Sequence, residues 1–299
     1  NQSPRIEVSD STFCSSSLGR IGGVQQLNLA EACMKVGTIT HEIAHSLGIL
    51  HTQSRHDRDQ YVEIEWGNIN HTMLHNFNKE DVSRAEVHDI PYEFGSVMHY
   101  SEKDFVLDNS KSSLRAKFPH EIYQKSMLGR MPTFFDVIQM NKHLNCFANC
   151  PSSIDCLNGG VQDVNACDRC KCPMGWTGDK CNQRPSDTVV INASEADQVF
   201  KHRAGNRNGG ASLFYNQTFY LFKAPPGRRV QFTPKVLGTQ WTNSCESMGI
   251  EVQVKTDPRF AGVQICDWRE TYAPIISSTD ELVVMAYTRG GLSAIDFIY

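Results

Sequence analysis

Residues 41–51 read His-Glu-Ile-Ala-His-Ser-Leu-Gly-Ile-Leu-His. His41 and His45 are four residues apart, so on a helix their imidazoles share one face and can reach one ion. Gly48 can take the positive φ that ends a helix, and the turn brings His51 back as a third nitrogen ligand. Three neutral protein ligands leave a tetrahedral zinc ion one open position for water. The stretch predicts a helix over about 36–47 and one zinc ion per chain.

Glu42 lies beside His41 on the same helix, where its carboxylate can accept a proton from that water. The alternative is structural, because a histidine on an apolar helix is usually a packed core residue and a bare H-E-x-x-H also arises by chance. Gly48 and His51 at fixed offsets reduce that risk by roughly two to three orders of magnitude. The zinc interpretation is therefore favoured.

A second motif, Ser-Val-Met-His-Tyr at 96–100, places Met98 where metzincin proteases have a methionine turn. Together with further stretches it resembles the astacin family over nearly all of residues 5–146. These stretches are Cys-Ser-Ser-Ser-Leu-Gly-Arg at 14–20, Gly-Gly-Val-Gln at 22–25, Arg-His-Asp-Arg-Asp-Gln-Tyr-Val at 55–62, Asn-Ile at 68–69, Asn-Phe-Asn-Lys at 76–79 and Tyr-Glu-Phe-Gly at 92–95.

The astacin resemblance implies roles for the residues around the metal. Glu42 is the general base, and Met98 is a floor beneath the zinc rather than a ligand. Tyr100 is an additional ligand that swings away to stabilise the tetrahedral intermediate. Most astacins have glutamate after the third histidine, where it anchors the mature N-terminus, but this chain has Thr52. The zinc chemistry does not need that carboxylate, but the resemblance does not extend to the N-terminal anchor.

The fold class that follows is an α+β metzincin protease domain over 1–146. Arg5–Val8 and Val24–Leu29 alternate as strands, and the resemblance makes Val24–Leu29 the edge strand that pairs with an extended peptide. A closing helix is expected over 136–144. The polar stretch 104–132 is expected to be irregular and to form the lower wall of the cleft.

Other polar residues of this domain have structural interpretations. His99 is expected to be packed or hydrogen-bonded, Asp136 to cap a helix and Glu63 to lie on a solvated face. The charged residues of 55–59 are expected to form a structural ion-pair cluster, with substrate contact as the alternative. They are Arg55, Asp57, Arg58 and Asp59.

Six cysteines are concentrated between residues 150 and 181. A zinc ribbon is one explanation, but so short a segment has little core of its own, which favours three disulfides. A C-x-C and a Pro-Met-Gly-Trp-Thr-Gly close make 147–183 resemble an EGF-like module. The resemblance implies the pairs Cys150–Cys167, Cys156–Cys170 and Cys172–Cys181, which spacing alone does not select.

Residues 187–299 contain short β-like runs between turn signals, which predicts an all-β sandwich. The span from Cys245 to Cys266 and the strings that follow it resemble a CUB domain and imply one disulfide, Cys245–Cys266. Ser247 and Met248 stand where calcium-binding CUB domains have Tyr-Asp, so no calcium is expected. The runs are Thr188–Ile191, Phe214–Phe222, Val230–Phe232, Ile250–Val254, Glu281–Tyr287 and Ala294–Tyr299.

The remaining cysteines concern the protease domain. Cys14 and Cys33 have a family precedent as a pair, which leaves Cys146 unpaired. Astacins pair the cysteine at that place with one near an N-terminal helix, and no such helix follows Asn1. We therefore expect the chain to be a fragment of a longer secreted precursor, with an incomplete N-terminal sheet.

Composition limits the function classes. The formal net charge is −4 across 299 residues, without the clustered basic excess that nucleic-acid binding needs, and no apolar run reaches the length of a membrane helix. Eleven cysteines indicate an oxidising compartment, and the sequons at Asn70, Asn192 and Asn216 are glycosylation candidates.

The leading hypothesis is a secreted zinc endopeptidase acting on extracellular proteins, with EGF-like and CUB-like modules that bind protein or carbohydrate partners. A non-catalytic extracellular binding protein with a degenerate protease fold is the first alternative, and a structural matrix protein is the second. The intact motif residues argue against both, because a complete zinc triad would be idle in either. They are His41, Glu42, His45, His51, Met98 and Tyr100.

Overall fold

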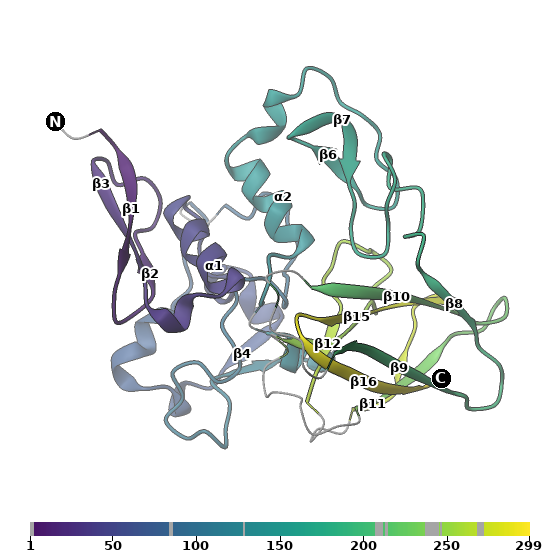
Figure 1. Cartoon of the computed structure of the whole chain (residues 1–299). Coiled ribbons are helices and arrows are strands. Elements are labelled where there is room, and N and C mark those ends of the chain that lie inside the picture. The colour runs from purple at the N-terminus through teal and green to yellow at the C-terminus, as the bar shows by residue number, and fades with distance from the viewer. Residues whose placement is uncertain are drawn as a thin grey trace. The chain divides into compact units, whose positions relative to one another are not determined.

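The computed structural model describes residues 3–83, 86–127, 129–206, 212, 215–236, 245, 247–267 and 272–299 (Figure 1). The chain divides into two compact units, Asn1–Ala148 and Asn149–Tyr299. Among the described residues, no helix has both the length and the apolar character needed to cross a bilayer.

The N-terminal unit begins with a three-stranded sheet in the order β1-β3-β2. β1 (Arg5–Asp10) runs parallel to β3 (Val24–Leu29), and β2 (Ser15–Ser16) pairs antiparallel with β3 near its end. Both expected strands therefore form. The expectation that 24–29 is an edge strand is wrong, because β3 lies between two partners and the short β2 is the strand at that edge.

The active-site helix α1 (Val36–Ser46) has the expected bounds within one residue and contacts β2 and β3. The closing helix α2 (Phe134–His143) starts two residues earlier than expected. Thr133 accepts a hydrogen bond from the Asp136 amide, and the Asp136 carboxylate accepts one from the Thr133 amide. This capping box fixes the start of α2. The cap residue is Thr133, and Asp136, which was expected to be the cap, is its partner in the first turn.

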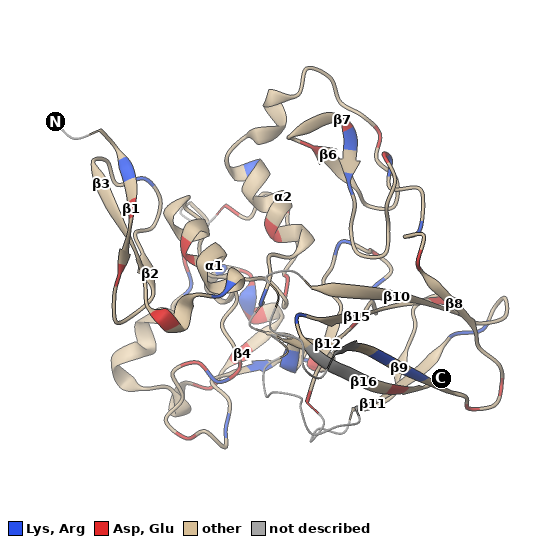
Figure 2. Cartoon of the chain, viewed as in Figure 1, with Lys and Arg blue, Asp and Glu red and all other residues tan. Residues whose placement is uncertain are grey.

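Between the two helices the N-terminal unit is mostly irregular. The stretch 104–132 contains only one strand and one short helix in its described residues, as expected. β4 (Val62–Ile64) pairs with β5 (Leu114–Ala116), and Figure 2 shows acidic and basic residues interspersed around β4. The 3-10 helices are η1 (Glu31–Cys33), η2 (Thr52–Ser54), η3 (Arg58–Gln60), η4 (Trp66–Asn68), η5 (His71–Phe77), η6 (Glu121–Ser126) and η7 (Cys146–Asn149).

The second unit opens with a disulfide-rich segment. Its hairpin consists of β6 (Val161–Asp163) and β7 (Ala166–Lys171). Three disulfides link Cys150 to Cys167, Cys156 to Cys170 and Cys172 to Cys181. They supply the cross-links that a segment with so little core requires.

The rest of the second unit is a pair of facing sheets. Phe222 from one sheet meets Phe232 and Phe297 from the other, with ring centroids 5.4 and 6.2 Å apart. The first sheet has the order β13-β12-β15-β10-β8 and the second β14-β11-β16-β9. Their bounds are β8 Val189–Asn192, β9 Val199–Asn206, β10 Asn216–Lys223, β11 Gln231–Val236, β12 Met248–Val252, β13 Val263–Ile265, β14 Ile275–Ile276, β15 Glu281–Thr288 and β16 Gly291–Ile298.

Each of the six expected β-like runs overlaps one of these strands, although Phe214 lies outside the described residues. Three strands, β9, β13 and β14, were not expected. A disulfide joins Cys245 to Cys266. The facing sheets agree with the predicted all-β fold, while the CUB-like and EGF-like identities stay proposals.

Candidate zinc centre and active site

Three imidazoles converge at the end of α1. The Nε2 atom of His51 lies 3.0 Å from Nε2 of His45 and 3.2 Å from Nε2 of His41. The three ligand atoms all lie within 4.8 Å of one another, close enough to share one ion. Helical spacing places His41 and His45 on one face, and the turn after the helix returns His51, as the sequence predicts.

Two of these rings are held by backbone carbonyls. Nδ1 of His41 is 2.7 Å from the Val97 oxygen, and Nδ1 of His45 is 2.9 Å from the Ile49 oxygen. A carbonyl only accepts, so both Nδ1 atoms carry the proton and both Nε2 atoms keep a free lone pair. Burial lowers the pKa of His41 and lowers that of His45 to about 4, which keeps both rings neutral at pH 7.

The donor set fits zinc. Zinc sites with an open position commonly use three neutral imidazoles, and second carbonyl or carboxylate partners orient the rings. Burial also lowers the pKa of His51 well below its usual value, so all three nitrogens are unprotonated donors at neutral pH. These three histidines would hold the metal.

The turn that returns His51 is a Schellman motif. The Gly48 amide donates to the His45 oxygen at 2.9 Å, and the Ile49 amide donates to the Ala44 oxygen at 3.0 Å. Gly48 has φ +100°, a conformation that side chains rarely adopt. The same turn presents the Ile49 carbonyl to His45, so the geometry of the glycine orients a metal ligand.

Replacing Gly48 by alanine is expected to lower the free energy of unfolding by about 1–2 kcal/mol, because a side chain there strains the backbone. Zinc affinity should fall by ~10- to ~10²-fold, since the carbonyl that orients His45 moves. Thermal denaturation and a competitive zinc titration measure both effects. Gly67→Ala is the matched control, because nothing lies within 4 Å of the added carbon. Equal zinc affinity in the two variants would contradict the role of the turn.

Met98 is packed beneath the helix. Its side chain is buried and belongs to a cluster with Ala44, Ile49 and Val97, against which Met140 packs. The cluster is formed by apolar side chains, and the role of Met98 as a floor under the metal stays a prediction.

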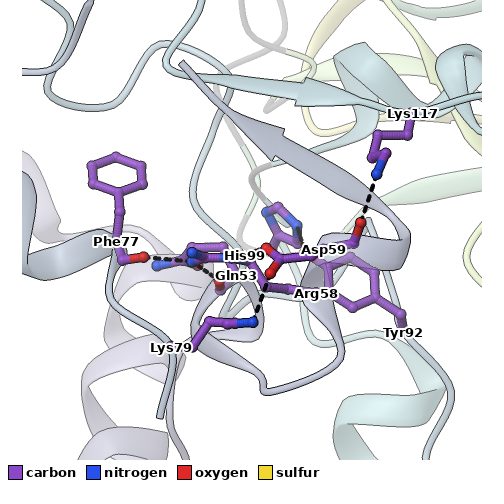
Figure 3. A network of polar contacts seen from close by, with 8 residues as sticks. All are labelled: Gln53, Arg58, Asp59, Phe77, Lys79, Tyr92, His99 and Lys117. Atoms are coloured by element: carbon purple, nitrogen blue, oxygen red, sulfur yellow. Dashed lines mark hydrogen bonds and ion pairs between the residues drawn. The ribbon is translucent and has the colours of Figure 1, made fainter. Parts of the chain in front are cut away.

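His99 is fully buried and accepts a hydrogen bond from the Tyr92 hydroxyl at 2.7 Å through Nε2 (Figure 3). Burial lowers the His99 pKa to about 4, so it stays neutral. The expectation that His99 is a hydrogen-bonded core residue is confirmed.

Glu42 and Tyr100 are the two proposed catalytic side chains beside the histidines. Glu42 is 6% exposed, its Oε2 atom has no hydrogen-bond partner among the described residues, and burial raises its pKa to about 7. The Tyr100 ring lies 4.5 Å from the His51 ring between centroids. Burial raises the pKa of Tyr100 to about 12, so its hydroxyl remains a donor at neutral pH.

Thr52 occupies the position where most astacins have glutamate. It is buried, and its backbone amide donates to the Met98 oxygen at 3.0 Å. Thr52 lines a cavity of about 250 Å³ together with Glu93 and Asp136. The contact with Met98 is made by the backbone, so it does not depend on which side chain follows His51.

The charged residues after His51 form structural contacts. Arg55 is 8% exposed and makes two 2.8 Å hydrogen bonds to the Asp57 carboxylate. Arg58 is 4% exposed and donates to the Asp59 carboxylate at 2.8 Å. These pairs support the structural interpretation of the cluster. Glu63, by contrast, is exposed and forms an ion pair with Arg115.

The other predicted residues are cysteines and glycosylation candidates. Cys14 and Cys33 form a disulfide, and Cys146 is the free cysteine among the described residues. Three sequon asparagines are exposed, which is the accessibility that glycosylation requires. They are Asn70, Asn192 and Asn216.

Three hydrogen bonds of the site were not predicted from the sequence. Gln53 accepts a hydrogen bond from the Tyr100 amide, and Asp136 accepts hydrogen bonds from Ser96 Oγ at 2.6 Å and from the Val97 amide at 2.9 Å. The expected capping role placed Asp136 at the start of α2, where it is the partner of the Thr133 cap. Its second set of contacts, to residues 39 and 40 positions earlier, has no local signal.

Comparison with known proteins agrees with this geometry. The astacin peptidase family matches residues 1–145. Zinc metalloproteinase nas-25 of Caenorhabditis elegans is 31% identical, with the match covering 98% of this chain and 75% of the relative. The chain belongs to the astacin family.

Other curated proteins and a solved structure also match parts of the chain. This astacin is 34% identical to zinc metalloproteinase nas-28 of Caenorhabditis elegans, over 89% of its own length and 56% of the relative. The chain spans about half the length of several curated relatives, including 50% of zinc metalloproteinase dpy-31 of the same organism. Among solved structures, High choriolytic enzyme 1 of the medaka fish Oryzias latipes is 36% identical, with 48% of this chain and 70% of that chain covered and a TM-score of 0.45.

Proposed function

We propose that this astacin is a zinc-dependent endopeptidase that hydrolyses peptide bonds of extracellular proteins. The observation that carries the proposal is the convergence of the three histidine Nε2 atoms within 4.8 Å, with the buried carboxylate of Glu42 on the same helix. A bound zinc ion supplies a Lewis acid that polarises the scissile carbonyl and lowers the pKa of water to about 7.

Glu42 then moves the proton. Its carboxylate accepts a proton from the attacking water and passes it to the nitrogen of the leaving amine. Burial, which raises the Glu42 pKa to about 7, makes the carboxylate a stronger base than an exposed one. A zinc ion held by the three histidines would favour the ionised form of the carboxylate through its positive charge, so the base would be available at neutral pH.

Tyr100 acts on the oxygen of the scissile carbonyl. Its hydroxyl remains protonated, because burial raises its pKa to about 12. A donor beside the histidines can stabilise the negative charge that develops on that oxygen. The ring contact with His51, at 4.5 Å between centroids, supports this placement.

The sheet beside α1 is the proposed binding surface for the peptide backbone. β2 lies at an edge of the sheet, and such an edge can add an extended peptide as a further strand. Just after β2, the Gly19 amide donates to the His45 oxygen at 2.8 Å. This hydrogen bond ties the loop after β2 to the helix that carries the zinc ligands.

The chain is proposed to act outside the cell. Five disulfides among the described residues fit an oxidising, extracellular compartment. We propose an EGF-like module over 147–183 and a CUB-like domain over 187–299, which bind protein or carbohydrate partners and do not require calcium.

Metal removal tests the proposed function. Dialysis against a chelator should abolish cleavage of a quenched peptide, and one equivalent of zinc per chain should restore it. Magnesium serves as the control, because it prefers oxygen ligands and octahedral geometry and should not restore activity. Full activity in protein shown by elemental analysis to lack zinc would refute the zinc mechanism and favour another kind of catalytic site. Absence of cleavage by protein that holds one zinc ion per chain would refute the proposal and favour a non-catalytic binding protein.

A further inference from the structure

We propose that Gln53 and Arg58 are positioning residues that hold Tyr100 in place from two sides. Gln53 fixes the Tyr100 backbone, and Arg58 fixes both Gln53 and the phenylalanine that packs on the Tyr100 ring. The inference rests on the proposed function, because the orientation of Tyr100 matters for catalysis only if its hydroxyl acts on the substrate.

The segment after His51, the third expected zinc ligand, is connected to the methionine turn around Met98. η2 follows His51 directly, and two hydrogen bonds join it to residues 98–100. The Thr52 amide donates to the Met98 oxygen at 3.0 Å, and the Tyr100 amide donates to Gln53 Oε1 at 3.1 Å. The second bond is the one that depends on a side chain, so Gln53 couples the His51 turn to Tyr100 specifically.

Gln53 is buried with one of its polar atoms unpaired among the described residues, which destabilises the fold. The residue is 0% exposed, and its Nε2 atom has no hydrogen-bond partner among the described residues. An unsatisfied buried donor destabilises the folded state, because its hydrogen bond to water is lost and not replaced. An apolar side chain of similar shape would fill the same space without that cost. The feature that an apolar side chain cannot supply is the oxygen that accepts the Tyr100 amide.

Arg58 holds the backbone on which Gln53 stands. It is 4% exposed, and Nη1 donates to the Gln53 oxygen at 2.8 Å and also to the Phe77 oxygen (Figure 3). One guanidinium nitrogen therefore joins η2 to the end of η5. Because its planar fork presents donors in fixed directions, arginine suits such a junction better than lysine.

The guanidinium is itself fixed by an ion-pair chain at the surface. Arg58 Nε donates to Asp59 Oδ1 at 2.8 Å, and Lys79 Nζ donates to Asp59 Oδ2 at 2.6 Å. Lys117 Nζ donates to the Asp59 backbone oxygen at 2.8 Å. Figure 3 shows these side chains around Arg58 and Gln53. The two lysines keep Asp59 in place, and Asp59 sets the orientation of the arginine.

Phe77 completes the arrangement on the ring side of Tyr100. It is 0% exposed, and its ring meets the Tyr100 ring edge-on at 5.6 Å between centroids. The Phe77 backbone oxygen is the second acceptor of Arg58. Arg58 thus acts on Tyr100 through Gln53 at the amide and through Phe77 at the ring. A reacting group displaced by ~1 Å can lose ~10²-fold in rate, so this double restraint has a functional consequence.

A pair of substitutions at Gln53 tests the proposal. Gln53→Met keeps the length of the side chain, loses the acceptor and removes the unsatisfied donor, so the protein should fold. It is expected to lower kcat by ~10- to ~10²-fold with little change in KM. Gln53→Glu keeps an acceptor oxygen toward the Tyr100 amide and should restore most of the lost kcat. Zinc content should equal that of the wild type in both variants.

Two further measurements separate positioning from other causes. Hydrogen exchange at the Tyr100 amide, which does not depend on activity, should be faster in Gln53→Met than in Gln53→Glu or the wild type. In a Tyr100→Phe background, Gln53→Met should cause little further loss, because both changes remove one function. Unchanged exchange, or a full additional loss in that background, would overturn the proposal. If the proposed function is wrong, the wild-type protein will show no zinc-dependent cleavage. The hydrogen-exchange measurement will still show whether Gln53 holds the Tyr100 amide.

Discussion

Glu42→Gln is expected to lower kcat by ~10²–10⁴-fold while the protein still binds one zinc ion per chain. Glutamine has the size of glutamate but no basic oxygen, so it cannot accept a proton from water. The Glu42 side chain is buried, and its Oε2 atom has no hydrogen-bond partner among the described residues, so the exchange breaks no structural contact of that atom. Steady-state kinetics with a quenched peptide and metal analysis measure the two quantities.

Glu63→Gln is the matched control for this prediction. It removes the same charge from an exposed carboxylate on β4 that is paired with Arg115. Its kinetic constants should equal those of the wild type. Wild-type turnover by the Glu42→Gln protein would end the general-base assignment. Loss of zinc together with activity would show that Glu42 supports the metal site instead.

The metal ligands were predictable because their geometry is local. His41 and His45 share a helical face, and one glycine sets the turn before His51, so spacing alone brings three nitrogens together. The Gln53 contact with Tyr100 joins residues 47 positions apart and depends on how two irregular segments pack. A polar residue in such a segment carries no periodic signal, which is why its partner could not be foreseen.

The fold shows the same division between local and long-range information. The end of α1 follows from Gly48. The start of α2 is set by the Thr133 cap, a local signal that the expectation of 136–144 did not use. The predicted position of β3 at the edge of its sheet was wrong, because strand order depends on pairing with distant segments. β9 was missed because its sequence, Val-Phe-Lys-His-Arg-Ala-Gly-Asn, mixes charged residues into the strand, and β13 and β14 are too short to show alternation.

The second unit shows where resemblance adds to physical reasoning. Spacing could not select a disulfide connectivity from six cysteines, whereas the EGF-like pattern implied the three pairs that the structure contains. The alternating runs of 187–299 predicted a sandwich, and the contact of Phe222 with Phe232 and Phe297 shows how the two sheets close on each other. What these modules bind depends on surface chemistry that neither alternation nor cysteine spacing encodes.

Tyr100→Phe is expected to lower kcat by ~10²–10³-fold and to leave KM nearly unchanged. The ring that packs against His51 and Phe77 remains, so the substitution removes only the hydroxyl. Burial raises the Tyr100 pKa to about 12, and the donor function is present below the pKa, so the wild-type hydroxyl is protonated on both sides of neutral pH. The ratio of wild-type to variant kcat should therefore stay constant across that range.

Phe105→Leu is a useful control for Tyr100→Phe, because Phe105 also contacts the Tyr100 ring, at 5.4 Å between centroids, but has no hydroxyl. If packing around Tyr100 were the important property, Phe105→Leu would reduce kcat as much as Tyr100→Phe does. If Tyr100 instead bound the substrate before the reaction, Tyr100→Phe would raise KM and spare kcat. A loss confined to kcat, and found only when the hydroxyl is removed, is what a donor that acts on the developing oxyanion requires.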